Sequence, residues 1–151
     1  MVILILRQRN FTFLKNRKID YIGDSTITEI LKAPKITEID LTFDQNMRPC
    51  VAFVSDSIPK LYWYDTKIGD FNITTFSGIL SPRVSLDDKR DFNISNSDII
   101  FAYIKNNGLY YRQQRERFTV EHLLKSYQNN HSKLLWRIGM GINNRFLFYV
   151  R

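Results

Sequence analysis

The residues of this chain that could do chemistry are few, and their spacing fits no catalytic pattern. Four carboxylates lie close together in the sequence: Asp87, Asp88, Asp91 and Asp98. A hard cation such as calcium takes six or more oxygen ligands, but the spacing of these residues matches no recognised calcium loop. Because Asp-rich turns are mostly solvated, we expect no metal at this place.

Nucleophiles and general bases are equally sparse. His122 and His131 lie in a polar stretch with no cysteine nearby, so zinc binding or histidine-based catalysis has little basis. Cys50 follows Pro49 at the start of an expected strand, where a small buried residue is the ordinary role. There is no glycine-rich phosphate loop and no nucleophile elbow. We therefore predict a protein that is not an enzyme and that uses no cofactor.

Arginines beside aromatic residues form the most distinctive stretch, Leu109 to Phe118. Such a pairing suits single-stranded nucleic acid, through stacking and phosphate contact. It also suits protein interfaces, where Tyr, Trp and Arg dominate the binding energy. The strand expected at Leu61–Tyr64 has aromatic residues without arginine, which favours a repeated structural strand. We predict protein-interface positions at Tyr62, Trp63, Tyr64, Tyr110, Tyr111, Arg112, Arg115 and Arg117.

Charge is distributed unevenly along the 151 residues. Residues 1–20 carry a net +4, residues 21–105 a net −3 and residues 106–151 a net +6, which gives the overall +7. Basic ends are compatible with nucleic acid, with complementary charge between neighbouring copies, or with a solvated basic surface. If neighbouring copies use this asymmetry, charge reversal at Arg115 and Arg117 is expected to weaken assembly.

The elements that must position these residues are short strands separated by turns. Residues 99–104 are almost wholly apolar, and Asn106-Asn107-Gly108 can take the positive φ of a tight hairpin turn. Residues 15–38 are polar and irregular, with one helical turn expected over 25–31. The other expected strands are 2–6, 11–14, 39–44, 51–54, 61–64, 71–76, 83–87, 109–112, 118–124, 135–140 and 145–150.

These strands fall into repeated four-stranded units, which predicts an all-β, antiparallel, propeller-blade-like architecture in a single domain over 1–151. The units are 38–78, 80–125, and 134–151 together with 2–14. The last unit has two strands of its own, which either the N-terminal strands or a neighbouring chain would complete. Three units are below the four to eight blades of a propeller, so an ordinary antiparallel β domain is the alternative.

Two turns partly resemble the Asp-box of sialidase-type blades: Thr42-Phe-Asp44-Gln-Asn46 and Ser85-Leu-Asp87-Asp-Lys89-Arg-Asp-Phe92. Asn46 or Lys89 replaces the glycine of that motif, and only the second copy has the expected aromatic residue. The Asp of such a box holds a turn, so the resemblance implies blade-like turns and no glycosidase activity.

Three stretches of the chain are distinctive: Ser81-Pro-Arg-Val-Ser-Leu-Asp-Asp-Lys-Arg90, Ser97-Asp-Ile-Ile-Phe-Ala-Tyr-Ile104 and Leu109-Tyr-Tyr-Arg-Gln-Gln-Arg-Glu-Arg-Phe-Thr-Val-Glu121. Through them, roughly residues 38–151 resemble a family of small virion proteins of tailed bacteriophages. The resemblance implies a structural component of the tail or head–tail region of a short-tailed phage.

The expected partners are other copies of the chain and other virion proteins (tail, adaptor, portal or fibre). The expected location is the virion, after synthesis in the bacterial host cytoplasm. The alternatives are a tail-associated receptor- or glycan-binding module, with binding that depends on Trp63, and nucleic-acid binding through the basic ends. No apolar segment is long enough to span a membrane, and Arg7 and Arg9 end the apolar run at 2–6 too early for a signal core.

Overall fold

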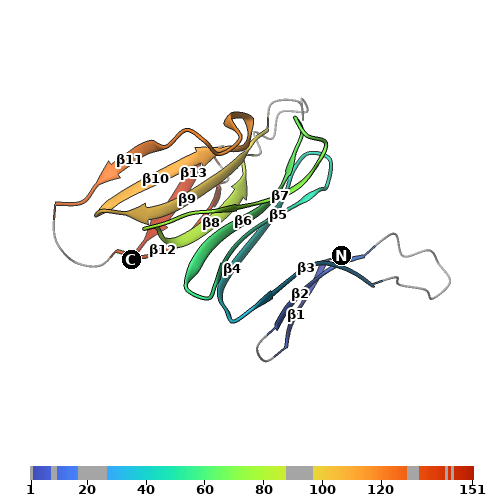
Figure 1. Cartoon of the computed structure of the whole chain (residues 1–151). Helices are drawn as coiled ribbons and strands as arrows, with labels where there is room; N and C mark the ends of the chain where they lie inside the picture. Colours follow the sequence, from blue (N-terminus) through green and yellow to red (C-terminus); the bar gives the residue numbers. More distant parts are fainter. Residues whose placement is uncertain are drawn as a thin grey trace. The chain divides into compact units, whose positions relative to one another are not determined.

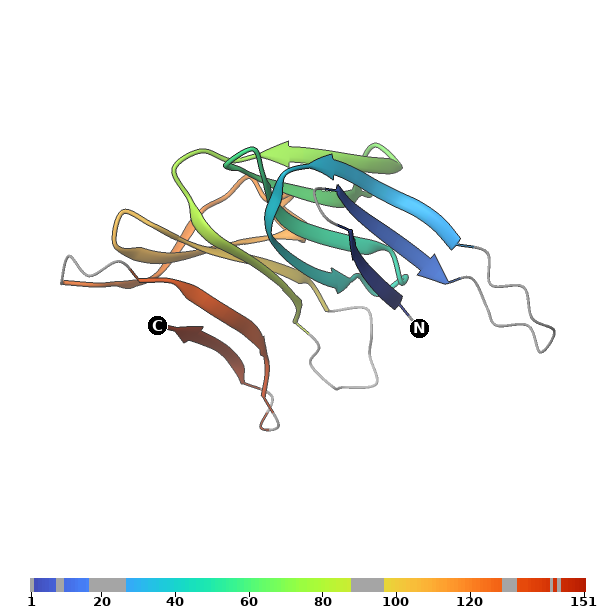
Figure 2. The same ribbon diagram turned by 90° about the horizontal axis from the view of Figure 1, so that it is seen from below.

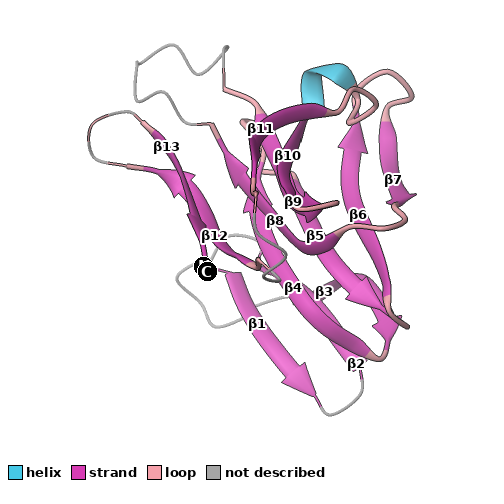
Figure 3. Ribbon diagram, turned by 90° about the vertical axis from the view of Figure 1, so that its left-hand side faces the viewer, coloured by secondary structure: helices cyan, strands magenta, loops and turns pink. Residues whose placement is uncertain are grey.

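The computed structural model is an all-β protein, as the sequence predicts (Figures 1 and 3). It describes residues 2–7, 10–16, 27–87, 97–128, 133–141, 143 and 145–151. Within these residues there is one short 3₁₀ turn, Gln114–Glu116, and no α-helix. The chain divides into two compact units, Met1–Thr37 and Glu38–Arg151.

The N-terminal unit is a three-stranded antiparallel sheet in the order β1-β2-β3. Its strands are β1 (Val2–Arg7), β2 (Asn10–Asn16) and β3 (Ile27–Pro34). The first two strands agree with the prediction, but the helical turn expected over 25–31 is wrong, because β3 begins at Ile27. The β-branched residues Ile27, Thr28 and Ile30 favour extended backbone over a helical turn.

The larger unit is built on two four-stranded antiparallel sheets, each made of four consecutive strands (Figure 1). The first contains β4 (Ile36–Phe43), β5 (Pro49–Ser55), β6 (Ile58–Asp65) and β7 (Asp70–Thr75). The second contains β8 (Leu80–Leu86), β9 (Ile99–Lys105), β10 (Gly108–Gln113) and β11 (His122–Ser126). The two repeated units predicted from the sequence coincide with these two sheets.

One predicted strand is displaced. The sequence pattern placed the fourth strand of the second sheet at 118–124, whereas β11 begins at His122. Arg117 and Phe118 instead take left-handed backbone conformations, with φ of 55° at both residues, and Phe118 is buried. The apolar Phe118 is therefore an anchor of the core after the 3₁₀ turn, and its apolar character had indicated a strand.

The hairpin between β9 and β10 forms as predicted. Asn106 and Asn107 both have positive φ, 46° and 58°, as the two central residues of a tight hairpin turn require. The continuous apolar run of β9 is explained by cover on both of its faces. Phe101 and Tyr103 contribute to the core shared with the first sheet, whereas Ala102 and Ile104 contribute to a second core on the opposite face.

The core between the two four-stranded sheets consists of apolar residues from both. Its buried members are Cys50, Ala52, Leu61, Trp63, Ile79, Val84, Ile99, Phe101, Tyr103 and Phe118. The sheets are also joined at an edge, since two side chains of β4 bond to backbone groups of β8. Asp40 accepts a hydrogen bond from Val84 N–H at 3.0 Å, and Thr42 accepts one from Leu86 N–H at 3.1 Å. These bonds occupy donors that the edge strand β8 would otherwise present to another chain.

The second core lies under a separate hairpin of β12 (Leu135–Met140) and β13 (Phe146–Val150) (Figure 2). Leu135 and Ile138 of β12 are buried there, and Phe146, Phe148 and Val150 of β13 pack against them while staying partly exposed. This hairpin is the two-stranded unit expected at 134–151.

Completion of this unit by the N-terminal strands, one of the two alternatives expected from the sequence, stays a prediction. Within the N-terminal unit, β1 pairs with β2, and β2 also pairs with β3, a strand that the sequence did not predict. Completion by a neighbouring chain stays a prediction, and so does a propeller-like arrangement of the sheets around an axis.

Candidate interaction site

Trp63, a predicted interface residue, is part of the core. Its side chain is 2% exposed, and its ring meets Phe118 edge-on at 5.1 Å between centroids. The indole N–H donates a hydrogen bond to Thr74 Oγ1 at 3.0 Å on the neighbouring strand β7. A sugar ring therefore cannot stack on Trp63 without opening the core, and the expected dependence of glycan binding on this residue stays a prediction.

The two tyrosines beside Trp63 are also engaged within the fold. Tyr62 is buried and lies parallel to Phe71 at 4.8 Å between ring centroids. Tyr64 donates a hydrogen bond to the carbonyl of Gly69 at 2.8 Å, and the guanidinium of Arg48 lies 3.9 Å from the centre of its ring. These contacts hold the ends of β6 and the following turn together.

Tyr110 and Tyr111 lie on opposite faces of β10, as residues adjacent in a strand do. Tyr110 packs on the core between the sheets and lies nearly parallel to Tyr103, with 6.3 Å between ring centroids. Tyr111 packs against the second core and stacks on His122 at 4.9 Å. Both rings are partly exposed, so they keep some surface for a partner.

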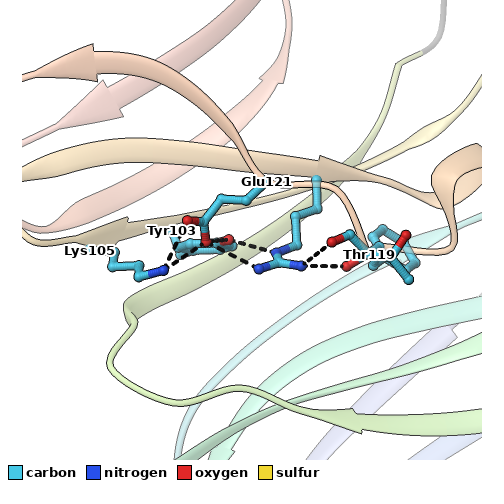
Figure 4. A network of polar contacts seen from close by, with 6 residues as sticks. Tyr103, Lys105, Thr119 and Glu121 are labelled. Carbon is cyan, nitrogen blue, oxygen red and sulfur yellow. Dashed lines mark hydrogen bonds and ion pairs between the residues drawn. The ribbon is translucent and has the colours of Figure 1, made fainter.

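Arg112 organises a polar network with side chains of β9 and with the segment between the 3₁₀ turn and β11 (Figure 4). Its Nε donates to the Tyr103 hydroxyl at 2.7 Å, and one terminal nitrogen donates to the carbonyls of Phe118 and Thr119 at 2.8 and 2.9 Å. Its other terminal nitrogen lies 3.2 Å from Glu121 Oε2. These bonds fix the chain just after the 3₁₀ turn, because they engage consecutive carbonyls there.

Glu121 is the carboxylate at the centre of this network. Tyr103 donates its hydroxyl to Glu121 at 2.5 Å, and Lys105 Nζ lies 2.9 Å from the other carboxylate oxygen. Burial alone would raise the pKa of Glu121, but the hydrogen bonds from Tyr103, Lys105 and Arg112 outweigh it and lower that pKa. Burial and the bond to Glu121 raise the pKa of Tyr103 well above its usual value. The network is thus internally satisfied and braces the fold.

Arg115 and Arg117 each pair with a buried aspartate. Arg115 Nε lies 2.6 Å from Asp98 Oδ2, and its backbone N–H also donates to this carboxylate at 3.1 Å. Arg117 contacts Asp65 Oδ2 through two nitrogens, at 3.1 and 2.5 Å, and the Asp65 side chain has no solvent-exposed surface. The hydrogen bond from Arg117 lowers the pKa of Asp65. Charge reversal at either arginine would place two carboxylates together, so it tests folding before it tests assembly.

The first Asp-box-like turn is held as its resemblance implied. Asp44 Oδ1 accepts hydrogen bonds from the backbone N–H groups of Asn46 and Arg48, both at 2.9 Å, and Arg48 Nε lies 2.6 Å from Oδ2. Of the second such turn, residues 85–92, the part from 88 to 92 lies outside the described residues. A cleft of about 420 Å³ lies beside the first turn, lined by Asp44, Arg48, Lys67, Asp98, Arg115 and Arg117.

The carboxylates considered as cation ligands do not gather in the described part of the chain. Asp98 is paired with Arg115, and Asp88 and Asp91 lie outside the described residues, as does His131. Within the described residues no group of three or more His, Cys, Asp or Glu side chains could hold a metal ion. Burial raises the pKa of Cys50 well above its usual value, so its thiol is the unreactive form at neutral pH.

The β12–β13 hairpin carries the largest exposed aromatic side chain of this unit, and the sequence reading did not select it. Trp136 is 66% exposed, Tyr149 is 50% exposed and Leu147 is 39% exposed. These three residues line a shallow surface with Arg137 and Gly139. The sequence does contain a signal for this surface, the uninterrupted apolar run 146–150. In a strand with no polar residues, both faces are apolar, so one face stays apolar and exposed when the other packs on a core.

The outer edge of this hairpin is open within the described residues. Strand β12 lies next to β8, where Arg83 Nε donates to the Trp136 carbonyl at 2.9 Å, whereas β13 pairs with β12 alone. Figure 3 shows β13 on the outer side of β12. An exposed strand edge with an adjoining apolar face is the surface of this unit best suited to binding another chain.

Comparisons with known proteins identify no relative, since no family model, no curated protein and no solved structure matches this chain. In the part of the chain that the structure describes, none of the helical segments has the length and apolar character needed to cross a bilayer.

Proposed function

We propose that this chain is a non-enzymatic structural protein of a bacteriophage virion, in the tail or head–tail region of a short-tailed phage. It acts by assembly with copies of itself or with other virion proteins. The resemblance of residues 38–151 to small virion proteins supports the virion assignment. The observation that carries the assembly role is the β12–β13 hairpin, whose outer edge is open among the described strands.

Physical reasons favour addition of a strand at this edge. A two-stranded hairpin is marginal by itself, and its stability grows when further strands extend its apolar face. Phe146, Phe148 and Val150 are only partly covered by the second core, so an added strand would bury more of each. By contrast, side chains of β4 already occupy backbone donors of the edge strand β8.

The decisive measurement is the solution mass of the purified chain, by light scattering after size exclusion at low and high salt. Assembly between copies predicts a defined oligomer that Val150→Pro converts to a monomer. The matched control is Val150→Ala, which also removes the valine side chain but keeps the backbone N–H at this position. Mass spectrometry of purified particles from producing cells tests the virion location. A monomeric chain that is absent from such particles contradicts the proposal.

A second candidate, a receptor- or glycan-binding tail module, is favoured by one polar cleft. It has a volume of about 550 Å³, and its lining combines hydroxyl and amide side chains with aromatic and charged ones, among them Asn72, Thr75, Ser77, Thr119, Phe76, Trp63, Lys105, Arg112, Arg117 and Glu121. Hydroxyl and amide groups next to an aromatic ring suit a saccharide. Glycan binding that is lost in Asn72→Ala and kept in Trp136→Ala would support this candidate over assembly through the hairpin.

A further inference from the structure

We infer that the outer edge of β13 binds an extended segment of another protein that is apolar in its middle and acidic at both ends. This inference rests on the proposed assembly role, and it specifies the chemistry of the partner at the same surface.

The backbone of β13 shows which groups a partner would meet. Arg151 exchanges two hydrogen bonds with Leu134, at 2.9 and 3.0 Å, and Arg145 accepts one from Gly141 at 2.8 Å. In an antiparallel ladder, alternate residues bond to the same neighbour. Residues 145, 147, 149 and 151 therefore bond to β12, and Phe146, Phe148 and Val150 direct their N–H and C=O groups to the opposite edge. The irregularity of this ladder lies at Trp136 on β12, so the alternation along β13 is unbroken.

An extended peptide satisfies this edge in a way that the phosphate backbone of a nucleic acid does not. Three residues present both N–H donors and C=O acceptors, and a peptide strand supplies a partner for each. A phosphate group accepts hydrogen bonds but donates none at neutral pH, so it would leave the carbonyls unpaired.

Side chains on both faces of β13 call for an apolar partner segment. On one face, Phe146, Phe148 and Val150 extend the second core. On the other face, Leu147 and Tyr149 are exposed. Apolar and β-branched residues opposite these side chains form the cross-strand pairs that stabilise a sheet.

The charges around the hairpin specify the ends of the partner. Every side chain from 133 to 151 that is charged at neutral pH is positive: Lys133, Arg137, Arg145 and Arg151. Arg145 and Arg151 flank β13, both are exposed, and neither side chain forms an ion pair with a described residue. Six residues of extended chain separate them by roughly 20 Å. A partner with acidic residues about six positions apart would therefore place one carboxylate near each arginine.

The test uses fluorescently labelled seven-residue peptides and the full chain, with binding followed by anisotropy. The first peptide is Glu-Val-Thr-Ile-Thr-Val-Glu. The second has lysine at both ends, and the third has proline in place of the central isoleucine. We expect the acidic peptide to bind on the order of tenfold more tightly than the basic one at low salt, with a smaller ratio at high salt. The proline peptide is expected not to bind, because it lacks a backbone donor in the middle of the strand.

A charge-swap variant provides the matched control. Arg145→Glu combined with Arg151→Glu is expected to reverse the preference, so that the basic peptide binds more tightly than the acidic one. Both arginines are exposed, so the variant should keep the unfolding midpoint of the parent chain.

Two results would overturn the inference. Equal binding of the acidic and basic peptides would remove the charge requirement and leave strand addition standing. The second result is that none of the peptides binds but oligothymidine does, with an affinity that falls steeply as salt is added. It would identify the hairpin as a nucleic-acid surface. The proposed function fails by a different result, a monomeric chain absent from virions, which the peptide measurements do not affect.

Discussion

Two regions of the larger unit carry aromatic and arginine residues of similar chemistry. In β6, β10 and the segment after β10 these residues are enclosed or paired, whereas in the β12–β13 hairpin several of them are exposed. Trp63 is enclosed in a core and bonded to Thr74, whereas Trp136 is two-thirds exposed. Arg112 and Arg117 bond to carboxylates and carbonyls of their own unit, whereas Arg145 and Arg151 have no side-chain partner among the described residues. Residues that dominate interfaces also serve as internal anchors, so composition alone does not locate a binding surface.

The largest effect expected from this comparison is that of Trp63→Ala. Removing a buried indole that packs on Phe118 leaves a cavity and should lower the free energy of unfolding by about 4 kcal/mol. Urea unfolding followed by circular dichroism measures it. A loss below 1 kcal/mol, on the order of a surface substitution, would contradict the placement of Trp63 in the core.

Arg112→Ala should have the next largest effect. It removes one of the three donors to Glu121 and the arginine that donates to the Tyr103 hydroxyl and to two carbonyls, and we expect a loss of about 3 kcal/mol. The same unfolding experiment measures it, with Arg151→Ala as the control arginine. An equal loss of unfolding free energy in Arg112→Ala and Arg151→Ala would contradict the distinction between arginines that are paired within the fold and arginines that are exposed.

A smaller effect should appear as a dependence of stability on pH. Because the pKa of Glu121 is lower in the folded chain than the ordinary 4.5, its contribution is present above pH 4.5 and declines as the pH falls below that value. In Glu121→Gln this part of the acid destabilisation should be absent, so its midpoint should change less between neutral and acidic pH. Parallel curves for both proteins would show that Glu121 does not contribute to the acid dependence.

The smallest effect on folding is expected at Trp136. Because its side chain is largely exposed, Trp136→Ala should change the free energy of unfolding by no more than about 0.5 kcal/mol. The expected consequence of this substitution is reduced assembly in light scattering, since Trp136 shares an exposed surface with Leu147 and Tyr149 of β13. A variant that assembles like the parent chain would exclude the Trp136 face from the interface and leave the edge of β13 as the remaining contact.

Much of the fold was predictable from local patterns. The apolar run of β9, the Asn106–Asn107 turn and the order of strands in both four-stranded sheets follow from residue types and their alternation. The failures came where apolar residues had roles that a local pattern does not distinguish. Phe118 anchors a core from a left-handed loop position, and Ile27–Pro34 pairs with β2 instead of forming an irregular segment.

The candidate site was less predictable, for a physical reason. Tyr62, Trp63 and Arg112 were selected for chemistry that suits an interface, but whether a side chain meets solvent depends on which sheet packs over its face. The carboxylates that neutralise Arg115 and Arg117 are distant in sequence, Asp98 by 17 residues and Asp65 by 52. No local pattern links such residues before the sheets have packed.

Local patterns were sufficient to predict most strands of the larger unit, its tight turns and the two four-stranded repeats, because these depend on the preferences of neighbouring residues. Which aromatic and arginine residues are enclosed and which remain open depends on how the sheets pack on one another. Burial and ion pairing arise when separate sheets meet, and the packing of β9 between two cores leaves the β12–β13 hairpin with one covered face and one exposed face.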